Sequence, residues 1–512
     1  MDFLRRIAIK LRSAMHQIWG MILPIKANEL SVFIPMAGIM FCFLANFSAL
    51  RSLKDSLVVP ELGAEVISFL KLWFVFPSSV GFTLLYMRLS NSFNIKQMYW
   101  IILTTFSIIF LIFGFILYPN IDLISSSEIM EIGLKYKYLK RITSIIAAWP
   151  LSLLYIIGDL WSAIMINLMF WQLANLITTE ETAKRFYPSF GLIGNFGLIT
   201  SGNLLVFLST SGNNFVGEFL SVNLDPSNNF VQIICFFIIS LNLISILLVS
   251  MVFKKVYVLE VGKKVNQLKV KTKLSIIESF KLIYHTKLLA YIASLVICYT
   301  VVITILEGPW KAQLAIVYKS PIEYLNFMGQ FNIYLGLASI FFVMLANFIL
   351  SRFSWLQAAL FSPVIMGITG TMFFLCIIYA DYFSYFTNPI VIATIVGAIQ
   401  NIISKSSKYS IFDTSKEIVY VPLSIELKSK GKAAIEVIGS KLGKSLGSFI
   451  QFLIFLDAGT VYADIYEYLL LIFIMVVSIW IYNVYKLNQE LKKLDVPDLI
   501  HNTSYQSSKT VS

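Results

Sequence analysis

Charged residues are scarce in this chain of 512 residues. Asp, Glu, Lys and Arg together make 13% of it, roughly half of the share that is usual in soluble proteins. Hydrophobic residues make 58%, and the mean hydropathy is +0.78. So few polar side chains could not cover the surface of a soluble fold of this size. The chain is therefore a membrane protein, and membrane lipid is its first expected partner.

Cysteine and histidine are also rare, with four and three residues respectively. No cysteines have CxxC or metal-ligand spacing, and the histidines are too scattered for a catalytic dyad. We expect packing roles for the cysteines, no metal, no cofactor and no enzymatic activity. The cysteines are Cys42, Cys235, Cys298 and Cys376, and the histidines are His16, His285 and His501.

The N-terminus lacks an uninterrupted apolar signal segment with a small-residue cleavage site. Residues 1–29 instead carry five cations among apolar residues, and we interpret them as a cytoplasmic amphipathic segment. Residues 486–512 are polar, and we expect a disordered cytoplasmic tail there.

Long apolar runs, by contrast, recur from end to end of the chain. A membrane-spanning helix needs about 20 apolar residues, and twelve runs reach or approach that length. We predict an all-α membrane protein with twelve transmembrane helices in two six-helix halves, the layout of a two-halved transporter. The runs lie at 30–50, 66–87, 98–118, 145–177, 186–208, 230–253, 288–310, 326–350, 355–380, 389–404, 433–456 and 465–485.

Lysine and arginine are distributed unevenly between the two sides of this layout. If the N-terminus is cytoplasmic, the cytoplasmic tails and connections hold 29 of the 40 cations and the opposite side holds 8. The positive-inside rule therefore predicts that both termini are cytoplasmic. This asymmetry explains the net charge of +12, so we do not expect a nucleic-acid partner.

A long lysine-rich connection at 254–287 divides the runs six and six. We predict an N-terminal half at 30–253 and a C-terminal half at 288–485. The fifth run contains IGNFGLITSG (Ile193–Gly202) and the eleventh contains IGSKLGKSLG (Ile438–Gly447). Similar motifs at equivalent places indicate that the halves are repeats.

The stretch from Gly443 to Ser445 resembles the end of a phosphate-binding P-loop. A P-loop needs a glycine where this chain has Ile438, and it follows a β-strand in a water-exposed domain. Both conditions fail, so we exclude a P-loop. Gly439, Gly443 and Gly447 recur every fourth residue, which is typical of closely packed membrane helices.

Several charges lie where the bilayer core should be. Lys441 and Lys444 are three residues apart and share one helical face, which favours contact with water or an anion. Snorkelling of these lysines to the membrane surface is the alternative. Asp159 lies in the middle of the fourth run, and Asn167 and Asn175 continue one polar stripe beyond it. A buried structural carboxylate paired with a lysine is the alternative for Asp159.

Further charges lie at the ends of the first, seventh, tenth and eleventh runs. Each lysine alone could be a solvated residue that sets topology. Together they place an excess of positive charge on helices that would line a central cavity, as a solute with three or four negative charges requires. The residues are Arg51, Lys54 and Asp55, then Glu307 and Lys311, then Lys405, Lys408, Lys416 and Lys432.

Four aromatic residues lie close to these charges: Trp161, Phe170 and Trp171 on the fourth run, and Trp310 beside Glu307. Any of them could stack on a nucleobase, a contact worth about 1 to 3 kcal/mol. Packing or interfacial anchoring is the alternative for each.

Four long segments resemble the signature sequences of the nucleotide transporter family, the ATP/ADP translocases of obligate intracellular bacteria and plastids. The likeness covers about residues 30–485. It implies a twelve-helix fold similar to the major facilitator architecture, and obligate counter-exchange of nucleotides across a bacterial inner membrane. The segments are RSLKDSLVV, GDLWSAIMINLMFWQLANLIT, EGPWKAQLAIVY and KEIVYVPLSIELKSKGKAAIEVIGSKLGKSLGS.

The resemblance also implies substrate roles for four charged residues, Lys54, Asp159, Glu307 and Lys444. Two positions depart from the family pattern. Asp159 stands where the family often has Glu, and Glu436 stands where an Asp is common. These departures leave the preferred base open.

We expect alternating access, with the two halves rocking around a midplane site. Lysines would hold the nucleotide phosphates, with help from Arg51, Lys311 and Lys441. Asp159 and Glu307 would pair with these cations in the empty carrier, so that ATP or a related NTP enters only in exchange for ADP or another nucleotide. The alternatives are an exchanger of a non-adenine nucleotide, a proton-coupled symporter of another small anion, and a receptor without transport.

Overall fold

The computed structural model describes residues 25–136, 139–212, 226–258, 286–383, 388–420, 435, 439–455 and 460–493. Most of the predicted segments 1–29, 254–287 and 486–512 lie outside these residues. The membrane-spanning units of the N-terminal half are α2 (Leu30–Leu62), α3–η2–α4 (Val66–Phe69, Leu70–Val75, Phe76–Ser92), α5–η3 (Ile95–Ile112, Phe113–Leu117), α9–η5–α10 (Trp149–Ile164, Met165–Phe170, Trp171–Ile177), α11–η6 (Glu180–Phe207, Leu208–Gly212) and α13 (Pro226–Val258). Those of the C-terminal half are α16 (Lys287–Val317), α17 (Pro321–Arg352), α18 (Trp355–Ile378), α20–η7–α21 (Pro389–Ser407, Lys408–Phe412, Asp413–Val419), α23 (Ser440–Ile454) and α24 (Tyr466–Lys493).

The predicted twelve-helix fold is confirmed. Within the described residues, eleven helical units are long and apolar enough to cross a membrane, and α23 adds a shorter apolar helix at Leu442–Ile454. Every backbone polar group in the bilayer core needs an internal partner, and a helix provides one within its own segment. Short helices complete the described fold: η1 (Ala27–Glu29), α6 (Ile121–Ile124), α7 (Ser127–Lys135), α8 (Lys140–Ala147), α19 (Ala380–Phe383) and η9 (Tyr462–Ile465).

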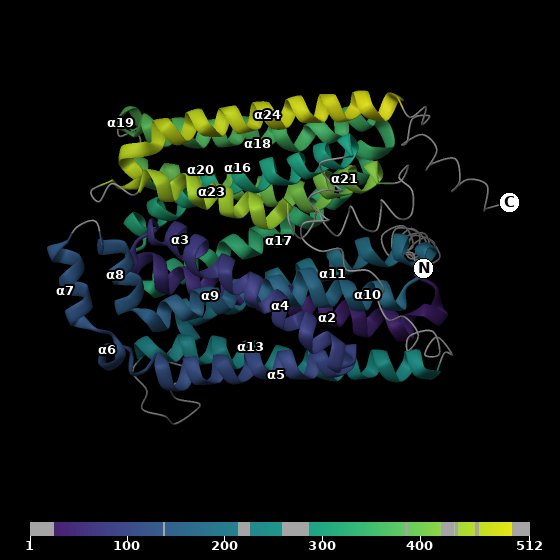
Figure 1. Cartoon of the computed structure of the whole chain (residues 1–512), viewed down its shortest axis with the longest axis horizontal. Coiled ribbons are helices and arrows are strands. Elements are labelled where there is room, and N and C mark those ends of the chain that lie inside the picture. Colours follow the sequence, from purple (N-terminus) through teal and green to yellow (C-terminus); the bar gives the residue numbers. More distant parts are fainter. Residues whose placement is uncertain are drawn as a thin grey trace, which may run out of the picture.

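The helices form two groups that lie one above the other in Figure 1, the N-terminal half below and the C-terminal half above. Both halves pack in the same way. The first helix of each half, α2 or α16, packs against the fifth and the sixth, which are α11 and α13 or α23 and α24. The third and sixth helices also pack together in each half, α5 on α13 and α18 on α24. This shared pattern supports the internal repeat that the sequence indicates.

The glycine stripe of α23 serves this helix packing. A Cβ atom added at Gly443 would lie 2.1 Å from the Thr300 hydroxyl of α16, and one at Gly447 would lie 2.8 Å from the Thr304 Cβ. In the repeated motif of α11, a Cβ at Gly194 would lie 2.6 Å from Leu44 of α2. The interpretation of these glycines as packing residues is confirmed.

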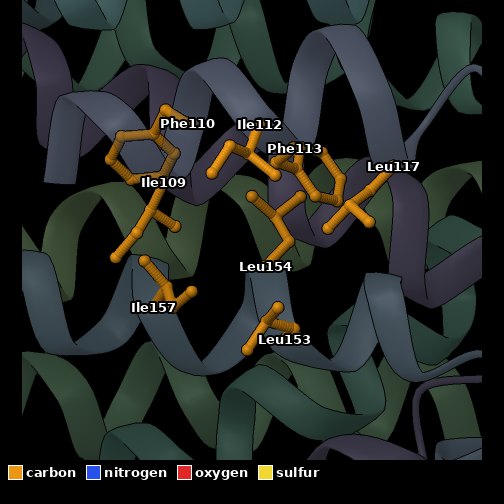
Figure 2. A pocket seen from close by; sticks show the side chains of 8 residues that line it. All are labelled: Ile109, Phe110, Ile112, Phe113, Leu117, Leu153, Leu154 and Ile157. Carbon is orange, nitrogen blue, oxygen red and sulfur yellow. The ribbon is translucent and has the colours of Figure 1, made fainter. Parts of the chain in front are cut away.

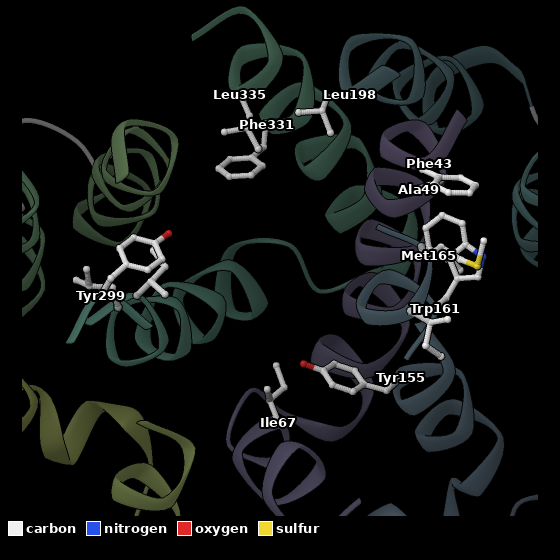
Figure 3. Packing of buried hydrophobic residues seen from close by; sticks show 14 of the residues in the cluster. Phe43, Ala49, Ile67, Tyr155, Trp161, Met165, Leu198, Tyr299, Phe331 and Leu335 are labelled. Carbon is white, nitrogen blue, oxygen red and sulfur yellow. The ribbon is translucent and has the colours of Figure 1, made fainter. Parts of the chain in front are cut away.

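Buried aromatic side chains hold the first and fourth helices of the N-terminal half together. Phe43 of α2 meets Trp161 of α9 edge to face, with ring centroids 5.7 Å apart (Figure 3). Neither ring is exposed. This contact holds α9, which also carries Asp159, in a defined orientation against α2.

The two halves meet mainly where α11 crosses α17. The backbones approach closely there, since a Cβ added at Gly202 would lie 2.6 Å from the Gly329 carbonyl oxygen. A second junction is formed by α3 and α23, where the rings of Phe69 and Phe452 lie 4.9 Å apart. Both junctions lie toward the end of the bundle that is remote from the N-terminus of α2, since Gly202 is near the C-terminal end of α11 and Gly329 is in the N-terminal part of α17. Figure 1 shows α3 at that end.

Several helices are longer than the apolar runs that predict them, and in three of them the extension carries charges of the site. α2 continues to Leu62, α16 to Val317, and the helical unit of α20 to Val419. The apolar runs ended too early because charged residues interrupt them, and these charges pair with one another inside the fold. The predicted runs leave Arg51, Lys54 and Lys311 in external connections and Lys405 in a cytoplasmic one. In the structure all four are helical residues within the bundle. Lys408 and Lys416 are helical as well.

Candidate functional site

A group of charged side chains joins the two halves near the middle of the molecule. Glu307 of α16 is at its centre. Its carboxylate lies 2.8 Å from Arg51 of α2 and 2.7 Å from Lys405 of α20. Arg51 and Glu307 are only 12% and 15% exposed, so their attraction acts with little screening by water.

One helical turn further along both helices, the order of charges is reversed. Asp55 of α2 lies 2.8 Å from Lys311 of α16, and these side chains are 0% and 4% exposed. Next to them, the Asn332 side chain of α17 donates a hydrogen bond of 2.8 Å to Ser52. We call the two cross-half ion pairs, between Arg51 and Glu307 and between Asp55 and Lys311, the lock.

A third ion pair lies within the N-terminal half. The Lys54 amine bonds to the Asp159 carboxylate of α9, and it also lies 3.8 Å from the centre of the Tyr155 ring. Gly158 leaves room for this lysine, since a Cβ there would lie 3.2 Å from the Lys54 Cδ. The Lys54 side chain is 7% exposed, whereas that of Asp159 is 26% exposed. Asp159 is therefore the accessible member of the pair.

Two lysines on opposite halves lie within electrostatic range of Asp159. One is Lys444 of α23, which is exposed, and the other is Lys71 of η2. The predicted substrate residues Lys54, Asp159, Glu307 and Lys444 thus belong to one region of the fold.

Other predicted site residues lie elsewhere. Trp310 is fully buried in the C-terminal half, where its indole N–H donates to the Thr394 carbonyl and its ring packs on Phe331. No face of this ring is open to a base, so packing, the alternative given above, explains it. Lys416 pairs with Asp413 at 3.4 Å, about 16 Å along the helix from Lys405.

The polar stripe of the fourth helix continues away from Asp159. Asn167 is exposed in the π-helical segment η5. Asn175 accepts a hydrogen bond of 2.5 Å from the Tyr187 hydroxyl, and Trp171 packs edge to face on the same Tyr187 ring at 5.0 Å. Lys441 lies in α23, but its side chain is outside the described residues.

The spacing of charges in the sequence could have predicted the lock. Arg51 and Asp55 are four residues apart, and so are Glu307 and Lys311, with the charges in opposite order. On two helices that lie side by side, such spacing allows both pairs to form in one register. Lys405 and Tyr155 offered no comparable signal, because only the packing of α20 and α9 brings them to the site.

One cleft on the described residues differs from the charged site in its lining. It lies between α5–η3 and α9, holds about 300 Å³, and is lined only by apolar residues (Figure 2). Phosphates would lose their hydration there without gaining a partner. A cleft of this kind suits lipid chains.

Two six-helix halves joined by a central cluster of charges define a membrane transporter of major-facilitator-like fold. Solved structures support this class by fold alone. A bacterial homologue of the iron transporter ferroportin, in an inward-facing state, matches 90% of this chain and 99% of its own, with a TM-score of 0.56 and 12% identity. The nucleoside transporter NupG matches 89% and 99%, with a TM-score of 0.55 and 14% identity.

The chain belongs to the TLC ATP/ADP transporter family, whose profile matches residues 9–491. It is 48% identical to ADP,ATP carrier protein 3 of Rickettsia prowazekii over 94% of this chain and 98% of that one. It is 38% identical to ADP,ATP carrier protein 4 of Rickettsia typhi over 94% and 96%. The resemblance to nucleotide transporters found in the sequence is thus confirmed, and the chain is a carrier.

Proposed function

We propose that this protein imports ATP, or a related nucleoside triphosphate, in obligate exchange for ADP or another nucleotide across a bacterial inner membrane. The observation that carries the proposal is the cluster itself, in which cations suited to phosphate form the ion pairs that join the halves. The relatives carry the name ADP,ATP carrier protein, which agrees with this substrate class.

In the proposed site, lysine and arginine side chains hold the phosphates. Lys54 and Lys444 contact the substrate directly, and Arg51 becomes available when a phosphate oxygen replaces Glu307. Lys311 is paired with Asp55 in the described conformation. It can bind a phosphate only after this ion pair opens. Lys441 is proposed to act with Lys444, because their spacing of three residues predicts a shared helical face.

The base would lie along the fourth helix beyond Asp159. Asn167 is exposed there and offers an amide for hydrogen bonds to a base edge. Trp171 and Asn175 extend the same face. Substitutions at these three positions should alter the ratio of ATP to GTP transport more than substitutions at the lysines.

The lock gives exchange a physical cause. Removing one partner of a buried ion pair costs about 3 to 5 kcal/mol, because the other charge is left without compensation. If the two halves of an empty carrier separated, both ion pairs would break and this free-energy cost would apply to each. A bound nucleotide would supply replacement charges, so that only the loaded carrier changes conformation readily.

Both termini are proposed to be cytoplasmic, in accordance with the distribution of lysine and arginine. The junctions between the halves then lie toward the outer side of the membrane. Arg141 of α8 strengthens that side, since its guanidinium donates to the carbonyl oxygens of Phe455 and Thr460 in the other half. The Tyr462 N–H donates to Glu65 across the same boundary at 3.4 Å. The described conformation is accordingly closed toward the outside.

The test is uptake of labelled ATP, GTP, CTP and UTP by vesicles that contain the purified protein, with and without unlabelled nucleotide inside. The proposal predicts uptake only into loaded vesicles, and the best-transported label identifies the base. Uptake that follows a pH gradient and ignores internal nucleotide would favour a proton-coupled symporter, with Asp159 or Glu307 as proton carrier. Absence of uptake under both conditions would favour a protein without transport activity.

A further inference from the structure

We propose that Lys71 is a further substrate-binding residue, which with Lys444 forms a two-lysine clamp for the terminal phosphates of a nucleoside di- or triphosphate. The inference rests on the proposed function and adds a residue and a selectivity to it. Lys71 lies in the second helix of the N-terminal half and Lys444 in the fifth helix of the C-terminal half. One phosphate chain would therefore be held by both halves.

The position of Lys71 places it among the charges of the site. It interacts electrostatically with Glu307, Lys311, Asp159 and Lys54. Its segment, η2, packs against both α9, which carries Asp159, and α23, which carries Lys444. Lys71 is thus located where the two halves and the accessible carboxylate meet.

The local backbone at this residue also departs from the α-helix. Lys71 is the second residue of η2, a π-helical segment of six residues inserted between α3 and α4. π-helical turns are rare, and they occur often at functional sites. They widen the helix locally and change the direction in which its side chains project.

Lys71 and Lys444 differ from the other cations of the site because, among the described residues, they lack a close counter-ion. Arg51, Lys54, Lys311 and Lys405 each lie within ion-pairing distance of a carboxylate. In the described part of the chain, no carboxylate comes within 4.0 Å of the Lys71 or Lys444 amine. A lysine inside a membrane-spanning helix is costly, and such residues usually mark a substrate or ion pathway. Two of them without counter-ions indicate a site for an added anion.

The arrangement also predicts which substrate feature is recognised. Asp159 already has Lys54 as its partner, so the charge of Lys71 and Lys444 is left for the substrate. The rings of Phe69 and Phe452 pack 4.9 Å apart on the same two helices, and Lys444 lies about 12 Å along α23 from Phe452. A polyphosphate with several charged groups can reach both amines, whereas a single phosphate can engage only one. Selectivity should therefore increase from mono- to di- to triphosphate.

The experiment compares Lys71→Gln with Lys71→Arg and with the control Lys96→Gln, an exposed lysine at the start of α5 in the same half. Exchange of ATP, ADP and AMP in vesicles gives KM and maximal rate. Thermal stabilisation of the purified proteins by ATP and by inorganic tripolyphosphate gives binding independently of transport. We expect Lys71→Gln to raise KM for ATP by about tenfold or more, with a smaller effect for AMP.

Lys71→Arg should restore most of the ATP affinity, and Lys96→Gln should behave as wild type. A purely structural lysine would instead lower thermal stability without nucleotide and leave the KM ratio of ATP to AMP unchanged. An unchanged KM and unchanged stabilisation by tripolyphosphate in Lys71→Gln would overturn the clamp while wild-type exchange still supports the proposed function. If wild type itself neither exchanges nucleotides nor is stabilised by them, both proposals fail.

Discussion

At the scale of single residues, Glu307 is the side chain on which the site depends most. It is shared by a cation from each half, Arg51 from the N-terminal half and Lys405 from the C-terminal half. The sequence could identify Glu307 and Arg51, because both interrupt or end apolar runs. It could not identify their pairing, because the distance between α2 and α16 is a property of the folded bundle.

Lys54 provides the most direct test at this scale. Lys54→Gln removes a phosphate ligand and leaves Asp159 without its partner, so exchange should fall at least about 100-fold. Lys54→Arg should retain part of the activity, since the charge remains. Rates are measured in vesicles with equal amounts of inserted protein, and wild-type rates in Lys54→Gln would contradict the assignment.

Trp310 is a residue for which residue type alone was misleading. An aromatic ring beside a charged motif is compatible with base stacking, but the fold uses this ring in the core. Trp310→Phe removes the hydrogen bond to the Thr394 carbonyl and should lower stability by about 1 kcal/mol. The ATP to GTP transport ratio should stay unchanged. A changed ratio, with unaltered melting temperature in detergent, would return Trp310 to the substrate site.

At the scale of helices, hydropathy was sufficient to predict the number of spans and insufficient to predict their ends. α2, α16 and the unit from α20 to α21 extend beyond the apolar runs because their charges are neutralised inside the bundle. Five described spans also contain π-helical segments, η2, η3, η5, η6 and η7. No pattern in the sequence predicts these segments, since a π-helical turn depends on the packing of its neighbours.

Glycine positions allow a matched test of helix packing. Gly443→Ala would place a methyl group 2.1 Å from the Thr300 hydroxyl and 2.9 Å from the Ile297 carbonyl oxygen. We expect it to destabilise the protein by about 1 to 3 kcal/mol. Gly191→Ala is the control, because no atom lies within 4 Å of the added methyl group and alanine favours the helix. Equal melting temperatures for the two variants would contradict the packing of α23 on α16.

At the scale of the whole molecule, the halves are joined toward the side that we propose faces outward. Arg141 contributes two hydrogen bonds and lies over the Phe455 ring at 5.1 Å. It lies in the connection between the third and fourth predicted runs, residues 119–144, which is on the side opposite the predicted cytoplasmic one, and no pattern in that connection indicates a partner. The contact with Phe455 and Thr460 arises only when α8 meets the end of α23.

Loss of Arg141 should make the outer side open more often. Ser52 is buried and bonded across the halves to Asn332, so a cysteine at this position reports such opening. In a background with the native cysteines replaced by alanine, Ser52→Cys should react faster with an external membrane-impermeant maleimide when Arg141→Ala is added. Lys140→Ala is the control, an exposed neighbour. Identical labelling rates would mean that Arg141 does not hold the outer side closed.

The central claim is that the cross-half ion pairs prevent the empty carrier from reorienting. The double variant Asp55→Asn, Lys311→Gln removes one pair without leaving an unpaired charge, so reorientation without substrate should become easier. The measurement is ATP uptake into empty and into ADP-loaded vesicles, for wild type and for this variant. We predict that wild type takes up ATP only into loaded vesicles, whereas the variant also fills empty ones. Uptake by the variant into loaded vesicles only, or equal uptake by wild type into empty and loaded vesicles, would contradict the account.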